Sequence, residues 1–135
     1  MCIRDRTKGG QTWTRCFWWG SAWQAIDADE TGQYLVASIH NGALFISSSY
    51  GESWIQTNSD WGWAYQGLAS SSDGEYVVAT NYPGASGGCV YISSSYGQTW
   101  TRSDAPCMSY GMIKSDKTAQ ILAEITNELY VSTSG

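Results

Sequence analysis

The stretch SSSYGESW, from Ser47 to Trp54, returns almost unchanged as SSSYGQTW from Ser93 to Trp100. A third and clipped copy, GGQTW, runs from Gly9 to Trp13. The tryptophans that close the three copies stand at positions 13, 54 and 100, so they are 41 and 46 residues apart. Self-similarity at this spacing is typical of proteins that are built from repeated structural units. The stretch therefore predicts a repeated turn inside a repeated unit.

The apolar segments between the copies repeat as well. Equivalent segments are Ala25-Ile26, Gly67-Leu68 and Gly111-Met112; then Tyr34–Ala37, Tyr76–Ala79 and Gln120–Ala123; then Leu44–Ser47, Val90–Ser93 and Leu129–Ser132. These runs are short and rich in β-branched and aromatic residues, and Gly, Asn, Asp and Ser separate them, as in strands and turns. No stretch has a sustained helical period.

The pattern predicts four short strands in each of two complete units. They are expected at 23–28, 33–39, 43–48 and 53–57, and again at 64–70, 75–81, 88–94 and 99–102, with three more at 109–114, 119–125 and 128–133. Four short antiparallel strands in every 40–50 residues are typical of a propeller blade. We therefore predict an all-β fold, namely a β-propeller segment of four-stranded antiparallel blades, with two complete blades and a partial blade at each end.

The expected domain organisation is one propeller segment over residues 7–135, with a partial blade at 7–16, blades at 17–58 and 59–103, and a partial blade at 104–135. Residues 1–6, MCIRDR, have no apolar core of a signal peptide. They resemble adapter sequence translated from metagenomic reads, and we leave them out of the fold. We expect the rest to be an internal piece of a larger protein. The flanks of an open arc of blades could then self-associate.

The repeated phrase resembles the Asp-box, or BNR repeat, with the pattern Ser/Thr-x-Asp-x-Gly-x-Thr-Trp. The box positions in this chain are Gly10, Thr12 and Trp13; Ser47, Ser49, Gly51 and Trp54; and Ser93, Ser95, Gly97 and Trp100. The chain departs from the pattern where Asp is usual, because Ser49 and Ser95 stand there, and Lys8 in the clipped copy. The resemblance implies a turn between the third and fourth strands of a blade. Such boxes occur in sialidases, sortilin-type receptors and photosystem II assembly factors.

The phrase has a physical reason to be a folding device. Its glycine permits a backbone angle φ above zero. A short oxygen-bearing side chain can bond the backbone of its own turn, and Ser does this in place of Asp, though more weakly. The tryptophan can cover the hairpin and join the core between blades. We therefore expect the phrase to build the scaffold.

Ligand-binding residues are expected on the other face, where the repeats differ from one another, because binding sites favour variable loops on a rigid framework. The candidates in the links between blades are Trp18, Trp19, Trp61 and Trp63, and those in the turns between second and third strands are His40, Asn41, Asn81 and Tyr82. The indoles have two interpretations, which stay open. They can stack on a sugar or clasp a peptide, or they can pack one blade against the next.

The sequence does not support catalysis by this segment. A sialidase needs an arginine cluster for the carboxylate of its substrate, and only Arg15 and Arg102 follow the first six residues. His40 is the one histidine, so no catalytic set can be built on it. The acidic run 27–30 lacks the spacing of a calcium loop and is expected to be a solvated turn. We predict no metal, no cofactor and no enzymatic activity of this piece. A sialidase-like parent and a photosystem II assembly factor-like parent remain as alternatives.

Charge and cysteine content suggest the setting. The net charge of −5 gives nucleic-acid binding little support, and no apolar run is long enough to span a membrane. Cys89 and Cys107 are expected near the same end of one blade, where a disulfide is geometrically plausible. Buried free thiols are the alternative. We expect a secreted or extracytoplasmic protein whose partner is a protein or a carbohydrate.

Overall fold

The computed structural model describes residues 22–40, 42–59, 64–82, 88–107, 112–115, 122–125 and 129–131. Within these ranges every regular element is a strand, and no helix is present that could span a membrane. The strands are β1 (Trp23–Ala28), β2 (Leu35–Ile39), β3 (Leu44–Ser47), β4 (Ile55–Gln56), β5 (Ala64–Ser70), β6 (Val77–Tyr82), β7 (Val90–Ser93), β8 (Thr101–Arg102), β9 (Met112–Ser115), β10 (Leu122–Ile125) and β11 (Leu129–Val131).

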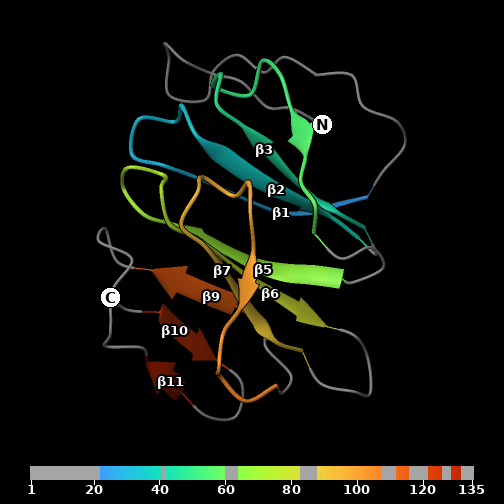
Figure 1. Ribbon diagram of the computed structural model, residues 1–135, viewed down its shortest axis with the longest axis vertical. Helices are drawn as coiled ribbons and strands as arrows, with labels where there is room; N and C mark the ends of the chain where they lie inside the picture. The colour runs from blue at the N-terminus through green and yellow to red at the C-terminus, as the bar shows by residue number, and fades with distance from the viewer. Residues whose placement is uncertain are drawn as a thin grey trace.

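The strands form three antiparallel sheets that follow one another in the order of the sequence (Figure 1). The first two sheets have the orders β1-β2-β3-β4 and β5-β6-β7-β8, and the third has β9, β10 and β11. In every sheet each strand pairs with its neighbour in the sequence, as in an up-and-down meander. The strands expected at 23–28 and 64–70 have those bounds, and most of the others are shorter at their ends. The prediction of four-stranded antiparallel sheets is confirmed.

The sheets pack face to face. Val36 and Leu44 of the first sheet form one apolar cluster with Tyr65, Leu68 and Ala79 of the second. Residues directly opposite each other in a pleated sheet point to the same side, so the pairing Leu68↔Ala79 places both on the face that meets the first sheet. Trp100 packs against this cluster, so the tryptophan of the second repeat joins the core between sheets.

The opposite face of the second sheet packs against the third. Ala69, Val78 and Val90 form a cluster with Ile113 of β9. The third blade therefore covers the face of the second blade that points away from the first.

Polar contacts also join the sheets. The buried Ser38 Oγ donates to the carbonyl oxygen of Tyr65 at 3.0 Å, and the backbone N–H of Ser70 donates to Asp27 Oδ2 at 2.7 Å. Asp29 is buried, and its Oδ1 accepts from the N–H of Tyr34 at 2.8 Å. The prediction of a solvated acidic turn is therefore wrong for Asp29, because its carboxylate closes the turn after β1.

The first strands of the three sheets, β1, β5 and β9, lie next to one another. Gly67 of β5 makes this approach possible, since a Cβ there would lie 2.5 Å from Thr80 Oγ1 and 3.1 Å from Ile113 Cγ2. Successive antiparallel meanders that pack face to face, with their first strands adjacent, are the blades of a β-propeller. Below, the sheets β1–β4, β5–β8 and β9–β11 are called the first, second and third blade.

The two complete copies of the repeated phrase have nearly the same geometry. In the first, Ser47 Oγ accepts from the N–H of Gly51 at 2.9 Å, and Ser49 Oγ accepts from the N–H of Ser53 at 2.9 Å. In the second, the corresponding bonds of Ser93 and Ser95 have the same lengths. Each turn has two consecutive residues with positive φ: 57° and 80° at Tyr50 and Gly51, 55° and 78° at Tyr96 and Gly97. The serines at the third position of the phrase thus hold the turn.

Candidate functional site

A groove of about 620 Å³ lies where the first blade meets the turn of the second. Its lining comes from β3, β4 and the residues that flank them in the first blade, and from the repeated turn of the second. The lining residues are Tyr34, Ile46, Ser47, Ser48, Ser53, Ile55, Gln56, Thr57, Asn58, Tyr96 and Gln98. The groove therefore exists only because two blades are in contact.

Two contacts fix the wall that the second blade contributes. The rings of Tyr34 and Tyr96 lie with their centroids 4.5 Å apart at an interplanar angle of 35°. Behind this pair, the backbone of Gly97 sits so close to Ile46 that a Cβ at Gly97 would lie 2.6 Å from Ile46 Cγ2. The N–H of Tyr96 also donates to the carbonyl oxygen of Glu75 at 3.0 Å, which anchors the turn to its own blade.

The lining is polar but uncharged. Desolvation raises the pKa of the Tyr96 phenol above its usual value, and the nearby Glu75 carboxylate acts in the same direction, so Tyr96 remains a neutral phenol at neutral pH. Thr57 is only 5% exposed, and no described residue is a hydrogen-bond partner of its Oγ1. This oxygen is enclosed by the protein, so Thr57 does not offer its hydroxyl group to the groove.

Most residues that the sequence suggested for ligand binding lie outside the described part of the chain. These are Trp18, Trp19, Asn41, Trp61 and Trp63, together with the box residues Gly10, Thr12 and Trp13. Tyr82 ends β6, and its side chain is outside the description as well. His40 is exposed in the turn after β2, where its Nδ1 lies 3.2 Å from Gln24 Oε1. Of the eight candidates, His40 and Asn81 are thus the two whose side chains are described.

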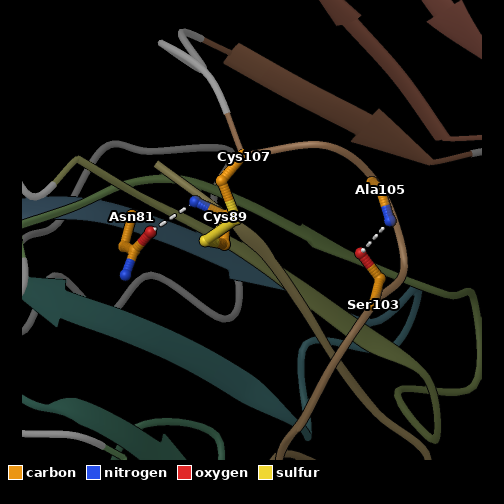
Figure 2. The surroundings of a disulfide bond; sticks show 5 residues. All are labelled: Asn81, Cys89, Ser103, Ala105 and Cys107. Carbon is orange, nitrogen blue, oxygen red and sulfur yellow. Dashed lines mark hydrogen bonds between the residues drawn. A yellow bond between two sulfur atoms is a disulfide. The ribbon is translucent and has the colours of Figure 1, made fainter. Parts of the chain in front are cut away.

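Asn81 belongs to the fold and not to an exposed site. It is 0% exposed, and its Oδ1 accepts from the N–H of Cys89 at 2.7 Å (Figure 2). The backbone N–H of Asn81 in turn donates to the carbonyl oxygen of Cys89 at 3.2 Å. The side chain closes the loop between β6 and β7, which corrects its assignment to a ligand-contacting surface.

The structure joins Cys89 and Cys107, the pair that the sequence suggested, in a disulfide across 18 residues of sequence (Figure 2). The bond holds the segment after β8 against the start of β7. Ser103 Oγ accepts from the N–H of Ala105 at 3.3 Å in this segment, and Ala105 packs against the core between the second and third blades. The disulfide therefore fixes the chain where it leaves one blade for the next.

Metal-binding groups are not gathered in the described residues, where no three His, Cys, Asp or Glu side chains could hold an ion together. Three aspartates of the described chain instead accept hydrogen bonds within the fold. Asp27 and Asp29 accept from backbone N–H groups, and Asp73 Oδ1 accepts from Ser71 Oγ at 2.6 Å. The hydrogen bond from Ser71 holds the pKa of Asp73 below its usual value.

The sequence did not indicate the groove. Its residues come from two different repeats, and the sequence directed attention to the loops at the other end of the strands. One signal was available: Tyr50 and Tyr96 recur inside the repeated phrase, where no rule of turn formation calls for a tyrosine. A large aromatic residue at a turn position with positive φ is uncommon and indicates a further role.

No protein-family model matches the chain, and no curated protein does. Solved structures do. A structure of YCF48 bound to D1 peptide matches with a TM-score of 0.66 and 13% identity, over 84% of this chain and 37% of that one. The GH74 enzyme of Niastella koreensis matches with a TM-score of 0.69 and 19% identity, over 87% of this chain and 21% of that one.

A third match is the β-propeller domain of Myceliophteria thermophila Cps50 (Swd1), with a TM-score of 0.56 and 17% identity, over 77% of this chain and 35% of that one. This chain thus spans between 21% and 37% of the length of the three structures. At these identities the likeness concerns the fold. The chain is a segment of a β-propeller.

Proposed function

We propose that this chain is a non-catalytic, ligand-binding segment of a larger β-propeller protein, and that its ligand is a protein or a glycan. The groove between the first two blades is the observation that carries the proposal. Its walls are fixed by Tyr34, Tyr96 and Gly97, and its lining consists of phenols, hydroxyls, carboxamides and aliphatic groups. Such groups bind by stacking and hydrogen bonding.

The repeated turns support this reading as scaffold elements. We interpret them as degenerate Asp-boxes, in which Ser49 and Ser95 replace the aspartate. Each of these serines accepts a hydrogen bond from the backbone four residues later, which is the task expected of the acidic residue. The repeated turns then stabilise the blades, and the groove between neighbouring blades provides the binding surface.

Two observations support a protein partner and an oxidising environment. A propeller of similar fold has been solved with a peptide bound, so this architecture can hold a polypeptide. The disulfide between Cys89 and Cys107 is of a kind that persists in secreted and extracytoplasmic proteins. We therefore place the protein outside the cytoplasm.

The proposal is tested by measuring binding and turnover on the same samples. The full chain is titrated by isothermal calorimetry with the best hits from a glycan array and from a peptide array, and each mixture is then analysed by mass spectrometry. Saturable binding with an intact ligand is expected. Cleavage of the ligand would refute the non-catalytic part, and the absence of saturable binding to both arrays would refute the binding part.

A second candidate is that the parent protein is an enzyme whose reactive residues lie in other blades. The match to a GH74 enzyme favours it, as does the resemblance of the repeats to sialidases. A long read of the source DNA across both ends of this piece distinguishes the cases. Three arginines on variable-face loops, with a Tyr–Glu pair and an Asp, would establish a sialidase-like parent. A parent with only further repeats would keep the scaffold function, including that of an assembly factor like those of photosystem II.

A further inference from the structure

The lining of the groove between the first two blades is uncharged, although the repeat itself allows charged residues at the equivalent positions. Gln56 and Asn58 of the first blade correspond to Arg102 and Asp104 of the second, which follow the same turn at the same distance. The repeat thus tolerates charge at both positions. The first blade has carboxamides there, and within the described chain none of the residues that line the groove is charged.

Carboxamides and hydroxyls can each donate and accept hydrogen bonds, whereas a carboxylate only accepts and an ammonium only donates. A ligand that presents many hydroxyl groups needs both capacities from its site.

The apolar part of the groove is compatible with the same ligand. Ile55 on the edge strand β4 is 68% exposed, and the Tyr34 and Tyr96 rings, whose centroids are 4.5 Å apart, also line the groove. Sugar rings combine a C–H face with a hydroxyl rim, so they can use an aromatic wall and a polar wall together. A volume of about 620 Å³ is within the range of small-molecule sites.

A peptide strand added to β4 fits less well. β4 has only two residues, and Ile46↔Ile55 and Phe45↔Gln56 are its pairs with β3. In an antiparallel ladder, alternate residues direct their backbone groups outward, so a strand this short offers almost no edge to a second chain. The backbone therefore contributes little, and the side chains decide which ligand binds.

We propose that this groove binds an uncharged, hydroxyl-rich ligand, a short neutral oligosaccharide, with the exposed side chains of Gln56, Asn58 and Gln98 as hydrogen-bonding groups and Tyr96 as the aromatic wall. The inference rests on the proposed binding function and adds to it the place and the chemical class of the ligand. It places the site at the seam between blades, at the end of the strands where the repeated turns lie.

The repeat supplies matched controls for a test. Tyr50 occupies the same position as Tyr96 in the other turn, has a similar φ and does not line the groove. Arg102 corresponds to Gln56 in the same way. The full chain and the variants Y96A, Y50A, Q56A and R102A are titrated with maltopentaose, cellopentaose and xylopentaose. A pentamer of galacturonic acid is the charged comparison, and thermal unfolding reports whether each variant is folded.

The expected result is saturable binding of at least one neutral pentasaccharide by the wild type. The affinity should fall about tenfold or more in Y96A and Q56A, because the loss of one or two hydrogen bonds or of a stacked ring corresponds to about this factor. The affinity should be unchanged in Y50A and R102A. Because Gln56 is exposed, its replacement should leave the fold intact, so Q56A still tests the groove if Y96A does not fold.

Other results overturn the inference in distinguishable ways. Equal affinity of Q56A and wild type for the sugar would refute the groove as the binding site and leave the proposed function in place. Binding of array peptides but of no neutral sugar would remove the ligand class and leave the binding function. Preference for the galacturonic acid pentamer would contradict the argument from neutrality. Binding of neither sugars nor peptides would refute both the inference and the proposed function.

Discussion

Replacing Gly97 with alanine should reveal how tightly the two blades are locked together. Gly97 and Gly51 occupy the same place in the two turns, with φ of 78° and 80°. An alanine at either position bears the strain of the left-handed conformation, about 1–2 kcal/mol. At Gly51, among the described residues, the new Cβ would meet the Trp54 ring at 3.8 Å, which is an ordinary contact. G51A should therefore lower the free energy of unfolding by about 1–2 kcal/mol.

At Gly97 a second effect adds to this. The new Cβ would lie 2.6 Å from Ile46 Cγ2, so the turn or the neighbouring blade must move. Overpacking of this kind destabilises by about 1–3 kcal/mol. G97A should therefore lower the free energy of unfolding by about 2–5 kcal/mol, and the excess over G51A measures the contact between blades.

Urea unfolding followed by tryptophan fluorescence gives both values, from midpoints at a constant slope. The variant I46A supplies the check, since it removes the atom with which the new Cβ collides. In the I46A background, the difference in destabilisation between G97A and G51A should nearly vanish, because residue 97 is coupled to residue 46 through this contact. Equal destabilisation by G97A and G51A in the wild-type background would refute the reasoning.

Three further outcomes are expected. The double replacement of Cys89 and Cys107 by alanine should lower the free energy of unfolding by about 3 kcal/mol, because an 18-residue loop is no longer closed in the unfolded chain. Calorimetry of the oxidised wild type and of the variant measures this difference. Ser38→Ala should lower it by about 1–3 kcal/mol in urea unfolding, because two backbone groups, one on each blade, lose their partner. The lowered pKa of Asp73 stabilises the fold above its unfolded value of 3.8, and this contribution is lost as the pH falls through the lower folded value. The difference in the free energy of unfolding between wild type and Asp73→Asn should therefore be constant above pH 3.8 and shrink below it, as measured by urea unfolding at a series of pH values, and a difference that does not change with pH would contradict the role of Ser71.

The architecture could be read from the sequence because its signals are local. Each strand is a short run of β-branched and aromatic residues between turn formers, and the repeated phrase marks one turn per blade. The replacement of aspartate by Ser49 and Ser95 could also be understood, since the capping bond needs only a short oxygen-bearing side chain. Local chemistry therefore predicted both the strands and the turn that joins them.

What escaped the sequence depends on contacts between repeats. Ile26 and Leu68 hold the same position in β1 and β5, yet Ile26 is 59% exposed and Leu68 only 7%, because only Leu68 has a described blade packed over it.

The candidate site escaped for the same reason. Asn81 was taken for a loop residue because asparagine before Tyr-Pro reads as a turn, and its buried bond to Cys89 could not be foreseen without the course of β7. The groove could not be foreseen either, since Tyr34 and Tyr96 are far apart in sequence and meet only when two blades pack. Reasoning from one repeat at a time locates the turns, but it does not locate the contacts between neighbouring blades.

This contrast bears on how a chain made of near-identical units acquires a specific ligand. The two complete phrases fold alike, so neither copy by itself distinguishes one part of the propeller from another. The groove needs Gln56 from one unit and Tyr96 from the next, and its character changes with whichever residues happen to meet. At the following seam the residues that correspond to Gln56 and Asn58 are Arg102 and Asp104, so a site there would present charge. Because the phrase has the same geometry in its two described copies, substitution at a few positions on the rim of the groove can change the ligand without disturbing the fold.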